Sequence, residues 1–246
     1  MDQSRGMIAQ MRAVTISREY GSGGGEIASR LAQRLGWQLI DHEIVVRVAR
    51  EMDVSEEEAE ARDERTEGVV SRILSSMQLV DPNLVVGPPV LPVESARAYH
   101  AALSSVVEAA VAKGNVVIVG RGSQALLAQR RDVLHARIVA PLEARIAYVM
   151  QREGLGRADA QARIQLKERN RSRYLQTAHH LQPEDAHLYD LVVNTGILDL
   201  DSIAELLISA LAYKAKQLAT PIEQLGPGAG LTRYPGQPGD LRQPVQ

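Results

Sequence analysis

One stretch of this chain constrains its fold more than any other, residues 13–36, which read AVTISREYGSGGGEIASRLAQRLG. Residues 13–17 form a short apolar, β-branched run of the kind that makes a buried strand. A loop with four glycines in five positions follows. From Glu26, apolar residues recur at helical spacing and stop at Gly36, a typical residue just past a helix end. A strand, a glycine-rich loop and a helix in this order surround an anion, usually a phosphate, with backbone N–H groups.

The loop keeps only part of the Walker A phosphate-binding pattern, G-x-x-x-x-G-K-[ST]. When Gly23 is taken as the second glycine, Arg18 stands at the first. Gly24 and Gly25 then replace the lysine and the hydroxyl residue. Glu26 adds a carboxylate that suits the helix dipole but repels an unshielded phosphate. Phosphate or nucleotide binding is the functional interpretation of this loop, and a glycine turn that only serves tight strand–helix packing is the alternative.

The composition excludes several classes of function. The chain has 246 residues, of which 45% are hydrophobic, and its net charge of -2 argues against a nucleic-acid partner. It has no cysteine, which excludes disulfides and thiolate metal sites and fits a cytoplasmic protein. Aromatic residues make up only 3%, so stacking on aromatic rings is not expected as the main means of binding bases. No apolar run approaches the roughly 20 residues of a membrane span, and we expect no membrane partner.

Strands and helices alternate along the rest of the sequence. The apolar runs predict further strands at residues 37–40, 116–119, 135–140 and 191–194. Helical spacing predicts helices at residues 44–52, from 55, and at 69–79, 95–113, 141–152 and 200–211. This alternation predicts βαβ units and a parallel sheet with helices on both faces. We expect a flexible N-terminus over residues 1–11, one domain over 12–217, and a disordered tail rich in proline and glycine over 218–246.

Three segments follow predicted strands directly: the glycine loop, Asp41, and Gly120-Arg121-Gly122. Ligands bind beyond the carboxyl ends of parallel strands, so these segments should lie on one rim of the sheet. Arg121 is expected to bind phosphate there, with a surface salt bridge as the alternative. The most basic segment is 157–174, which predicts either a phosphate-binding helix or a solvated helix face.

Several segments together resemble the cytidylate kinase-like family, a divergent relative of bacterial cytidylate kinases. They are TISREYGSGGGEIASRLAQRLG, LIDHEIV, DER at 63–65, VVIVGRGS, RIAYVMQREG and YDLVVNT, and the likeness extends over about residues 12–212. The resemblance implies an α/β fold of the P-loop NTPase type: a three-layer parallel sheet with helices on both faces and a helical lid at about 153–175. It also implies a kinase that uses ATP and Mg²⁺ and phosphorylates a small acceptor, such as the nucleoside monophosphate CMP.

The resemblance implies a role for particular residues. The loop that holds the donor phosphates maps to Gly21, Ser22, Gly23, Gly24 and Gly25. Acceptor binding maps to Asp41, to Arg47 six residues later, and to Arg121, which keeps the arginine of a Gly-Arg-Asp motif without its carboxylate. Arginines that neutralise the transferring phosphoryl group map to Arg152, Arg169 and Arg173.

Three functions remain open at this point. In the first, the chain is a nucleotide-dependent kinase in which Arg18 or the arginines of residues 152–173 replace the missing lysine. Asp41 and Glu26 are then the candidates for binding Mg²⁺, with a plain helix-start acid as the alternative for Glu26. In the second, the chain is a nucleotide- or phosphate-binding sensor or scaffold without transferase activity. In the third, it is a kinase for another small acceptor. The sequence fixes neither the acceptor nor the oligomeric state.

Overall fold

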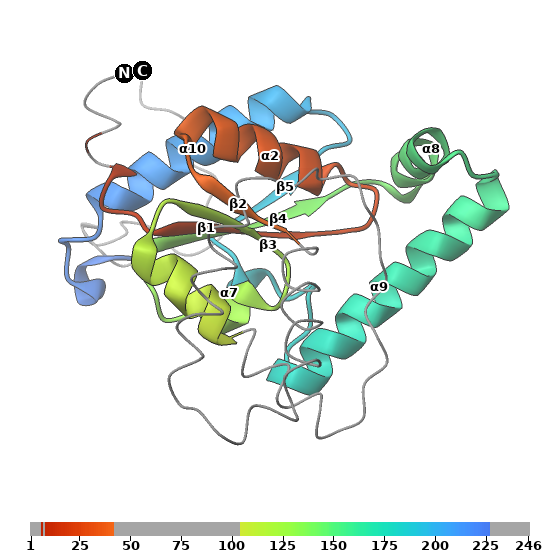
Figure 1. Cartoon of the computed structure of the whole chain (residues 1–246). Coiled ribbons are helices and arrows are strands. Elements are labelled where there is room, and N and C mark those ends of the chain that lie inside the picture. The colour runs from red at the N-terminus through yellow and green to blue at the C-terminus, as the bar shows by residue number, and fades with distance from the viewer. Residues whose placement is uncertain (1–5, 7, 42–103, 227–246) are drawn as a thin grey trace, which may run out of the picture.

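The centre of the fold is a five-stranded parallel sheet (Figure 1). The structure, a computed structural model, describes residues 6, 8–41 and 104–226. The strands lie in the order β2-β3-β1-β4-β5, and each neighbouring pair is parallel. They are β1 (Ala13–Arg18), β2 (Gln38–Ile40), β3 (Val116–Val119), β4 (Val133–Val139) and β5 (Leu191–Asn194). The predicted α/β class and parallel sheet are therefore confirmed, and β3 and β5 have the predicted bounds.

Helices cover both faces of this sheet (Figure 1). They are α2 (Gly24–Leu35), a helix over 104–113, α7 (Ser123–Leu126), α8 (Leu142–Glu153), α9 (Arg157–His179) and α10 (Leu200–Lys216). Two short 3₁₀ helices are η2 (Ala186–Leu188) and η3 (Ile222–Gln224). Helices α2 and α10 pack on one face, where Ile16 of β1 joins Leu31 and Leu207 in one apolar core. The helix over 104–113 packs on the other face, where Val107 joins Ile118. The predicted three layers are confirmed.

The helix ends follow their capping residues. Helix α2 begins two residues before the predicted Glu26, because Gly23 adopts a left-handed φ of 76° and serves as its N-cap. It ends at Gly36, whose φ is 67°, as the sequence predicts. Asp199 caps α10 by accepting hydrogen bonds from the N–H groups of Asp201 and Ser202 at 3.0 and 2.9 Å.

Helices α8 and α9 form a hairpin beyond the carboxyl ends of the strands (Figure 1). Gly154, with a φ of 66°, ends α8, and α9 then continues for 23 residues. A small apolar core joins the two helices and consists of Ile146, Val149, Ala160 and Ile164. This hairpin contains the segment 153–175 that the resemblance predicts as a lid.

Some expectations lie outside the described residues. They are the predicted helices between residues 44 and 79, the first part of the helix predicted over 95–113, residues 1–5, and the tail from 227. Arg47 lies outside them as well. No helix in the described part of the chain is long and apolar enough to cross a membrane.

Candidate active site

The glycine loop connects β1 to α2 in a conformation that two glycines make possible. Gly21 and Gly23 have φ values of 83° and 76°, in the left-handed region that side chains disfavour. A Cβ on Gly21 would lie 2.9 Å from the carbonyl oxygen of Arg145, and one on Gly23 would lie 2.9 Å from Cδ2 of Leu200. Both glycines are therefore needed for close packing as well as for the turn itself.

Ser22 shapes the loop from within. Its side chain is buried, and its hydroxyl donates to the carbonyl oxygens of Glu19 at 2.9 Å and Ile138 at 3.2 Å. Its own carbonyl oxygen accepts a hydrogen bond from the hydroxyl of Thr195 at 3.0 Å. The structure thus commits this hydroxyl to the protein backbone, so of the residues predicted to hold donor phosphates, Ser22 does not offer its side chain.

The first turn of α2 is the part of the loop best suited to an anion. Gly23 at the N-cap has no side chain, and the first N–H groups of a helix lack partners within the helix. Among the described residues, no atom lies within 4 Å of a Cβ built on Gly25, so space is open beside this turn. Partial positive charge, N–H donors and open space together favour a phosphate.

Arg18 lies directly beneath this turn. Its side chain packs against Gly24 and runs toward the end of β3, where Nη1 lies against Gly120. Burial and the nearby guanidinium of Arg171 lower the pKa of Arg18 to about 9, while the carboxylate of Asp41 acts in the opposite direction. The group is still a cation at neutral pH, and its surroundings favour a bound anion.

Helix α9 contacts the loop through Glu168 and Arg171. The guanidinium of Arg171 donates to the carbonyl oxygen of Arg18 at 3.0 Å. The carboxylate of Glu168 accepts from the backbone N–H of Tyr20 at 2.5 Å and from Arg171 at 3.3 Å. Burial lowers the pKa of Arg171 as well. The basic helix therefore contacts the glycine loop through these two side chains.

The arginines singled out in that helix lie elsewhere on it. Arg169 and Arg173 are both exposed, whereas Arg171 between them is only partly exposed and contacts the loop. Residues two apart lie on nearly opposite sides of a helix. Arg171 therefore lies on the side of α9 that meets the loop, and Arg169 and Arg173 lie on the other side. The sequence does contain a signal for Arg171. Glu168 and Arg171 are three residues apart, and such a pair shares one helix face.

Glu26 does not block the loop. Its carboxylate accepts hydrogen bonds from the hydroxyl of Tyr148 and the guanidinium of Arg152, both on α8. Arg152 also lies over the Tyr148 ring, 5.7 Å from its centre. The structure therefore turns this carboxylate toward α8 and offsets its charge, which leaves it poorly placed as a ligand for Mg²⁺.

The loop after β3 lies on the same rim. Gly120, Arg121 and Gly122 all have left-handed φ values, of 74°, 63° and 65°. A non-glycine residue in this region is uncommon and marks a segment held by its surroundings. A Cβ on Gly122 would lie 2.6 Å from Nε2 of His179, so the end of α9 packs directly on this loop.

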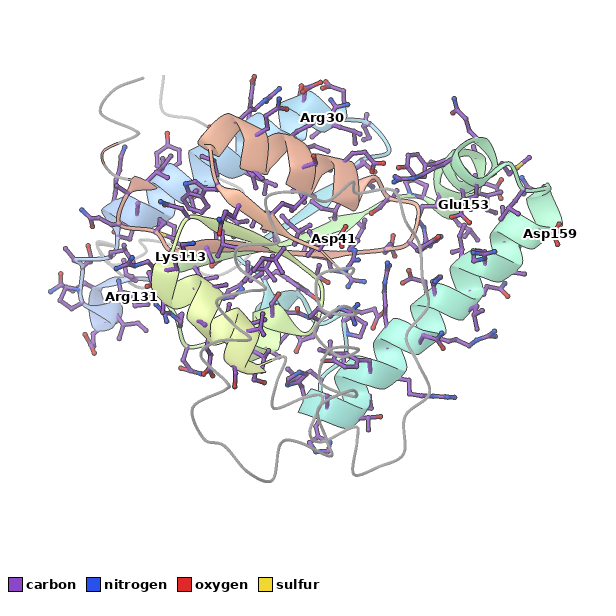
Figure 2. All side chains as sticks on the ribbon, in the orientation of Figure 1. Arg30, Asp41, Lys113, Arg131, Glu153 and Asp159 are labelled. Carbon is purple, nitrogen blue, oxygen red and sulfur yellow. The ribbon has the colours of Figure 1, made fainter. Side chains whose placement is uncertain are left out.

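The three segments expected on one rim do meet there. Asp41 follows β2 at the end of the sheet that faces the α8–α9 hairpin (Figure 2). Asp41 and Arg121 both act electrostatically on Arg18, from the ends of β2 and β3. The rim therefore carries the guanidinium groups of Arg18, Arg121 and Arg171 together with the carboxylate of Asp41.

No group of three potential metal ligands occurs among the described residues, which are only part of the chain. This does not conflict with Mg²⁺ binding in a kinase, because Mg²⁺ commonly uses one or two carboxylates together with substrate phosphates. Asp41, on the rim beside the glycine loop, suits that mode of binding better than Glu26 does.

Comparison with known proteins identifies the family. The chain matches the sequence model of the cytidylate kinase-like family over residues 13–197, three quarters of its length. The chain belongs to the cytidylate kinase-like family. A cytidylate kinase from Ignicoccus hospitalis is 26% identical over 196 residues, which cover 79% of this chain and 96% of that protein.

Two further similarities are more limited. A uronate isomerase from Corynebacterium glutamicum is 32% identical over 105 residues, but the match spans 43% of this chain and only 20% of that protein. The crystal structure of an uncharacterized protein from Eubacterium ventriosum superposes with a TM-score of 0.55 at 20% identity. The superposition covers 81% of this chain and 98% of that one, and it supports the fold alone.

Proposed function

We propose that this chain is a nucleotide-dependent kinase that transfers a phosphoryl group from ATP to a small acceptor, a nucleoside monophosphate such as CMP. The observation that carries the proposal is the open, uncapped first turn of α2 with Arg18 and Arg171 beside it. Phosphoryl transfer needs positioning and charge neutralisation more than covalent chemistry from the protein. Membership of the cytidylate kinase-like family supports the same reaction class.

Each part of the rim has a role in this proposal. The backbone N–H groups of residues 23–25 hold the donor phosphates, and Arg121 faces the acceptor. Asp41 would hold Mg²⁺, which would shield the negative charge of the phosphates. Arg171 takes the charge-neutralising role in α9, because Arg169 and Arg173 are exposed. Arg47 is a proposed acceptor ligand from the resemblance alone.

A sensor or scaffold that binds a nucleotide without transferring phosphate is the second candidate. The observation that favours it is the glycine at both Gly24 and Gly25, where active P-loops carry a lysine and a hydroxyl. A kinase for a different small acceptor shares the same donor site, so only the choice of acceptor separates it from the main proposal.

Incubation of the full chain with MgATP and a panel of nucleoside monophosphates tests these functions. ADP formed only with CMP or UMP supports the main proposal. Tight MgATP binding without turnover on any acceptor supports the sensor. A reaction without acceptor measures ATP hydrolysis and provides the baseline. Absence of MgATP binding by calorimetry would contradict both candidates.

The affinity for MgATP should fall as the pH rises above about 9. The pKa of Arg18 is about 9 in the free protein, and a bound phosphate raises it because the anion favours the charged guanidinium. Above pH 9 the complex therefore holds a proton that the free protein has lost, and affinity falls by up to about tenfold per pH unit. Below pH 9 both states are protonated and this effect is absent. Calorimetry from pH 7 to 10 measures it, and an affinity unchanged over that range would contradict the assignment.

Replacing Arg152 by methionine should weaken MgATP binding about tenfold, because the Glu26 carboxylate would then keep only the Tyr148 hydroxyl as a partner and its charge would no longer be offset. The second change Glu26→Gln in the same chain should restore the affinity, since it removes that charge. Calorimetry on the two variants and on Glu26→Gln alone completes the cycle. If the double variant binds as weakly as Arg152→Met, Arg152 acts on the nucleotide itself and not through Glu26.

A further inference from the structure

Arg18 and Gly24 occupy one space at the start of α2. A Cβ built on Gly24 would lie 2.6 Å from Cβ of Arg18 and 3.1 Å from its Cγ. Real Cβ atoms essentially never approach another atom so closely, and neither of these atoms is the far end of a flexible chain. A side chain at position 24, where Walker A loops carry their lysine, is therefore incompatible with Arg18 as it is placed.

The guanidinium of Arg18 ends beside the loop that follows β3. Its side chain runs past Gly24 to the end of β3, and a Cβ on Gly120 would overlap Nη1. The group thus ends between the glycine loop and the loop after β3, with Asp41 and Arg121 within electrostatic range. Gly24 and Gly120, on either side, both leave room for this one side chain.

The N–H donors of the Arg18 guanidinium are available to a ligand. Within the described residues its guanidinium makes no hydrogen bond or ion pair, and only longer-range effects of neighbouring charges act on it. Arg18 is only partly exposed, and its guanidinium carries five N–H donors that can bind an anion. The backbone of Arg18 is fixed by Arg171, which donates to its carbonyl oxygen at 3.0 Å. A phosphate at the first turn of α2 would supply the missing acceptors.

We propose that positions 18 and 24 have exchanged the glycine and the cation of the Walker A loop. The phosphate-binding cation is then Arg18 at the end of β1, and not a lysine at the start of α2. Arg18 then contacts the phosphoryl oxygens of the donor nucleotide in place of the usual lysine. This inference rests on the proposed function, since it assigns the cation of that same donor site.

A stability cycle tests the packing without any ligand. Gly24→Ala in the natural chain should lower Tm by about 4 °C or more, because its Cβ meets Arg18. In an Arg18→Gly background the same change should leave Tm unchanged or raise it by up to about 3 °C, since alanine is the better helix former. An equal loss of Tm in both backgrounds would contradict the inference that Arg18 and a side chain at position 24 compete for the same space.

A binding cycle tests the exchange itself. Calorimetry with MgATP and with magnesium tripolyphosphate should show at least about tenfold weaker binding for Arg18→Gly, as expected when one charge-assisted contact is lost. Arg18→Met, which keeps most of the stem that packs on Gly24, should lose as much. The double variant Arg18→Gly with Gly24→Lys should recover most of the affinity. Arg30→Gly is the matched control, because Arg30 lies on the outer side of α2 in an exposed ion pair with Asp201 (Figure 2).

The outcomes separate this inference from the proposed function. Undiminished binding by Arg18→Gly, or a double variant no better than Arg18→Gly, overturns the exchange even if the natural chain is an active kinase. Recovery in the double variant supports the exchange even if the natural chain phosphorylates no acceptor, in which case the kinase proposal alone fails. A natural chain that binds neither MgATP nor tripolyphosphate overturns both.

Discussion

Replacing Gly120 by alanine is expected to reduce phosphoryl transfer by about 10²-fold or more and to lower the free energy of unfolding by about 1 to 2 kcal/mol. Gly120 has a φ of 74°, which costs alanine about 1 kcal/mol. Its new Cβ would also overlap Nη1 of Arg18 and displace the guanidinium from the rim. The change therefore displaces the proposed phosphate ligand while the arginine at position 18 is kept. Steady-state kinetics and chemical denaturation measure the two losses, and MgATP calorimetry measures the accompanying loss of binding.

Gly36→Ala is the matched control for this prediction. Gly36 has a similar φ of 67°, yet no described atom lies within 4 Å of a Cβ built there. It should cost only the backbone strain, about 1 kcal/mol, and leave the MgATP affinity unchanged. If the two substitutions have equal effects on MgATP affinity, Gly120 is needed only for the backbone turn. The position of the Arg18 guanidinium then does not depend on the missing side chain at position 120.

Tyr20→Ala is expected to have the second large effect, because this side chain joins the glycine loop to the α8–α9 hairpin. Its hydroxyl donates to the carboxylate of Glu153 on α8, which Figure 2 labels in the hairpin. The guanidinium of Arg171 lies 5.4 Å from its ring centre, and the ammonium of Lys167 lies 6.0 Å away. The ring also packs against the small apolar core between the two helices.

Loss of this ring should lower the free energy of unfolding by about 3 kcal/mol, and kcat should fall about 10²-fold as Arg171 loses its support. Tyr20→Phe keeps the ring and should cost only about 1 kcal/mol. Burial and the hydrogen bond to Glu153 raise the pKa of Tyr20 to about 12, so the hydroxyl remains a donor at any pH used for the assay. Chemical denaturation and steady-state kinetics provide the two readouts.

Tyr213→Ala is the control for this prediction. Tyr213 is 67% exposed and lies beside Lys216 on α10, remote in sequence from the loop. Surface substitutions of this kind change stability by about 0.5 kcal/mol or less. If Tyr20→Ala costs no more than Tyr213→Ala, the hairpin does not depend on the ring.

The fold followed from local patterns in the sequence. The run of β-branched residues that forms β3 predicts a strand buried on both faces, and the structure has it at the predicted bounds. Gly36 and Asp199 mark helix ends by capping chemistry that involves only near neighbours. Such signals can be recognised without knowing the tertiary structure, and they account for the layers and for the shared rim.

The partners within the site could not be predicted in the same way. Glu26 is bound by Tyr148 and Arg152, more than 120 residues further along the chain, and no spacing rule connects them. The choice of Arg171 over its exposed neighbours depends on which side of α9 meets the loop, which the packing of the hairpin decides. Nor does a sequence show that the Ser22 hydroxyl is already used by the backbone.

The shared space of Arg18 and Gly24 also limits how a loop of this kind can arise or revert. A lysine cannot enter position 24 while the arginine is present, because their first side-chain carbons would collide. The arginine must leave first, and the intermediate with glycine at both positions has neither cation. Descent between the two forms of the loop therefore passes through a weakened ancestor, unless both codons change together.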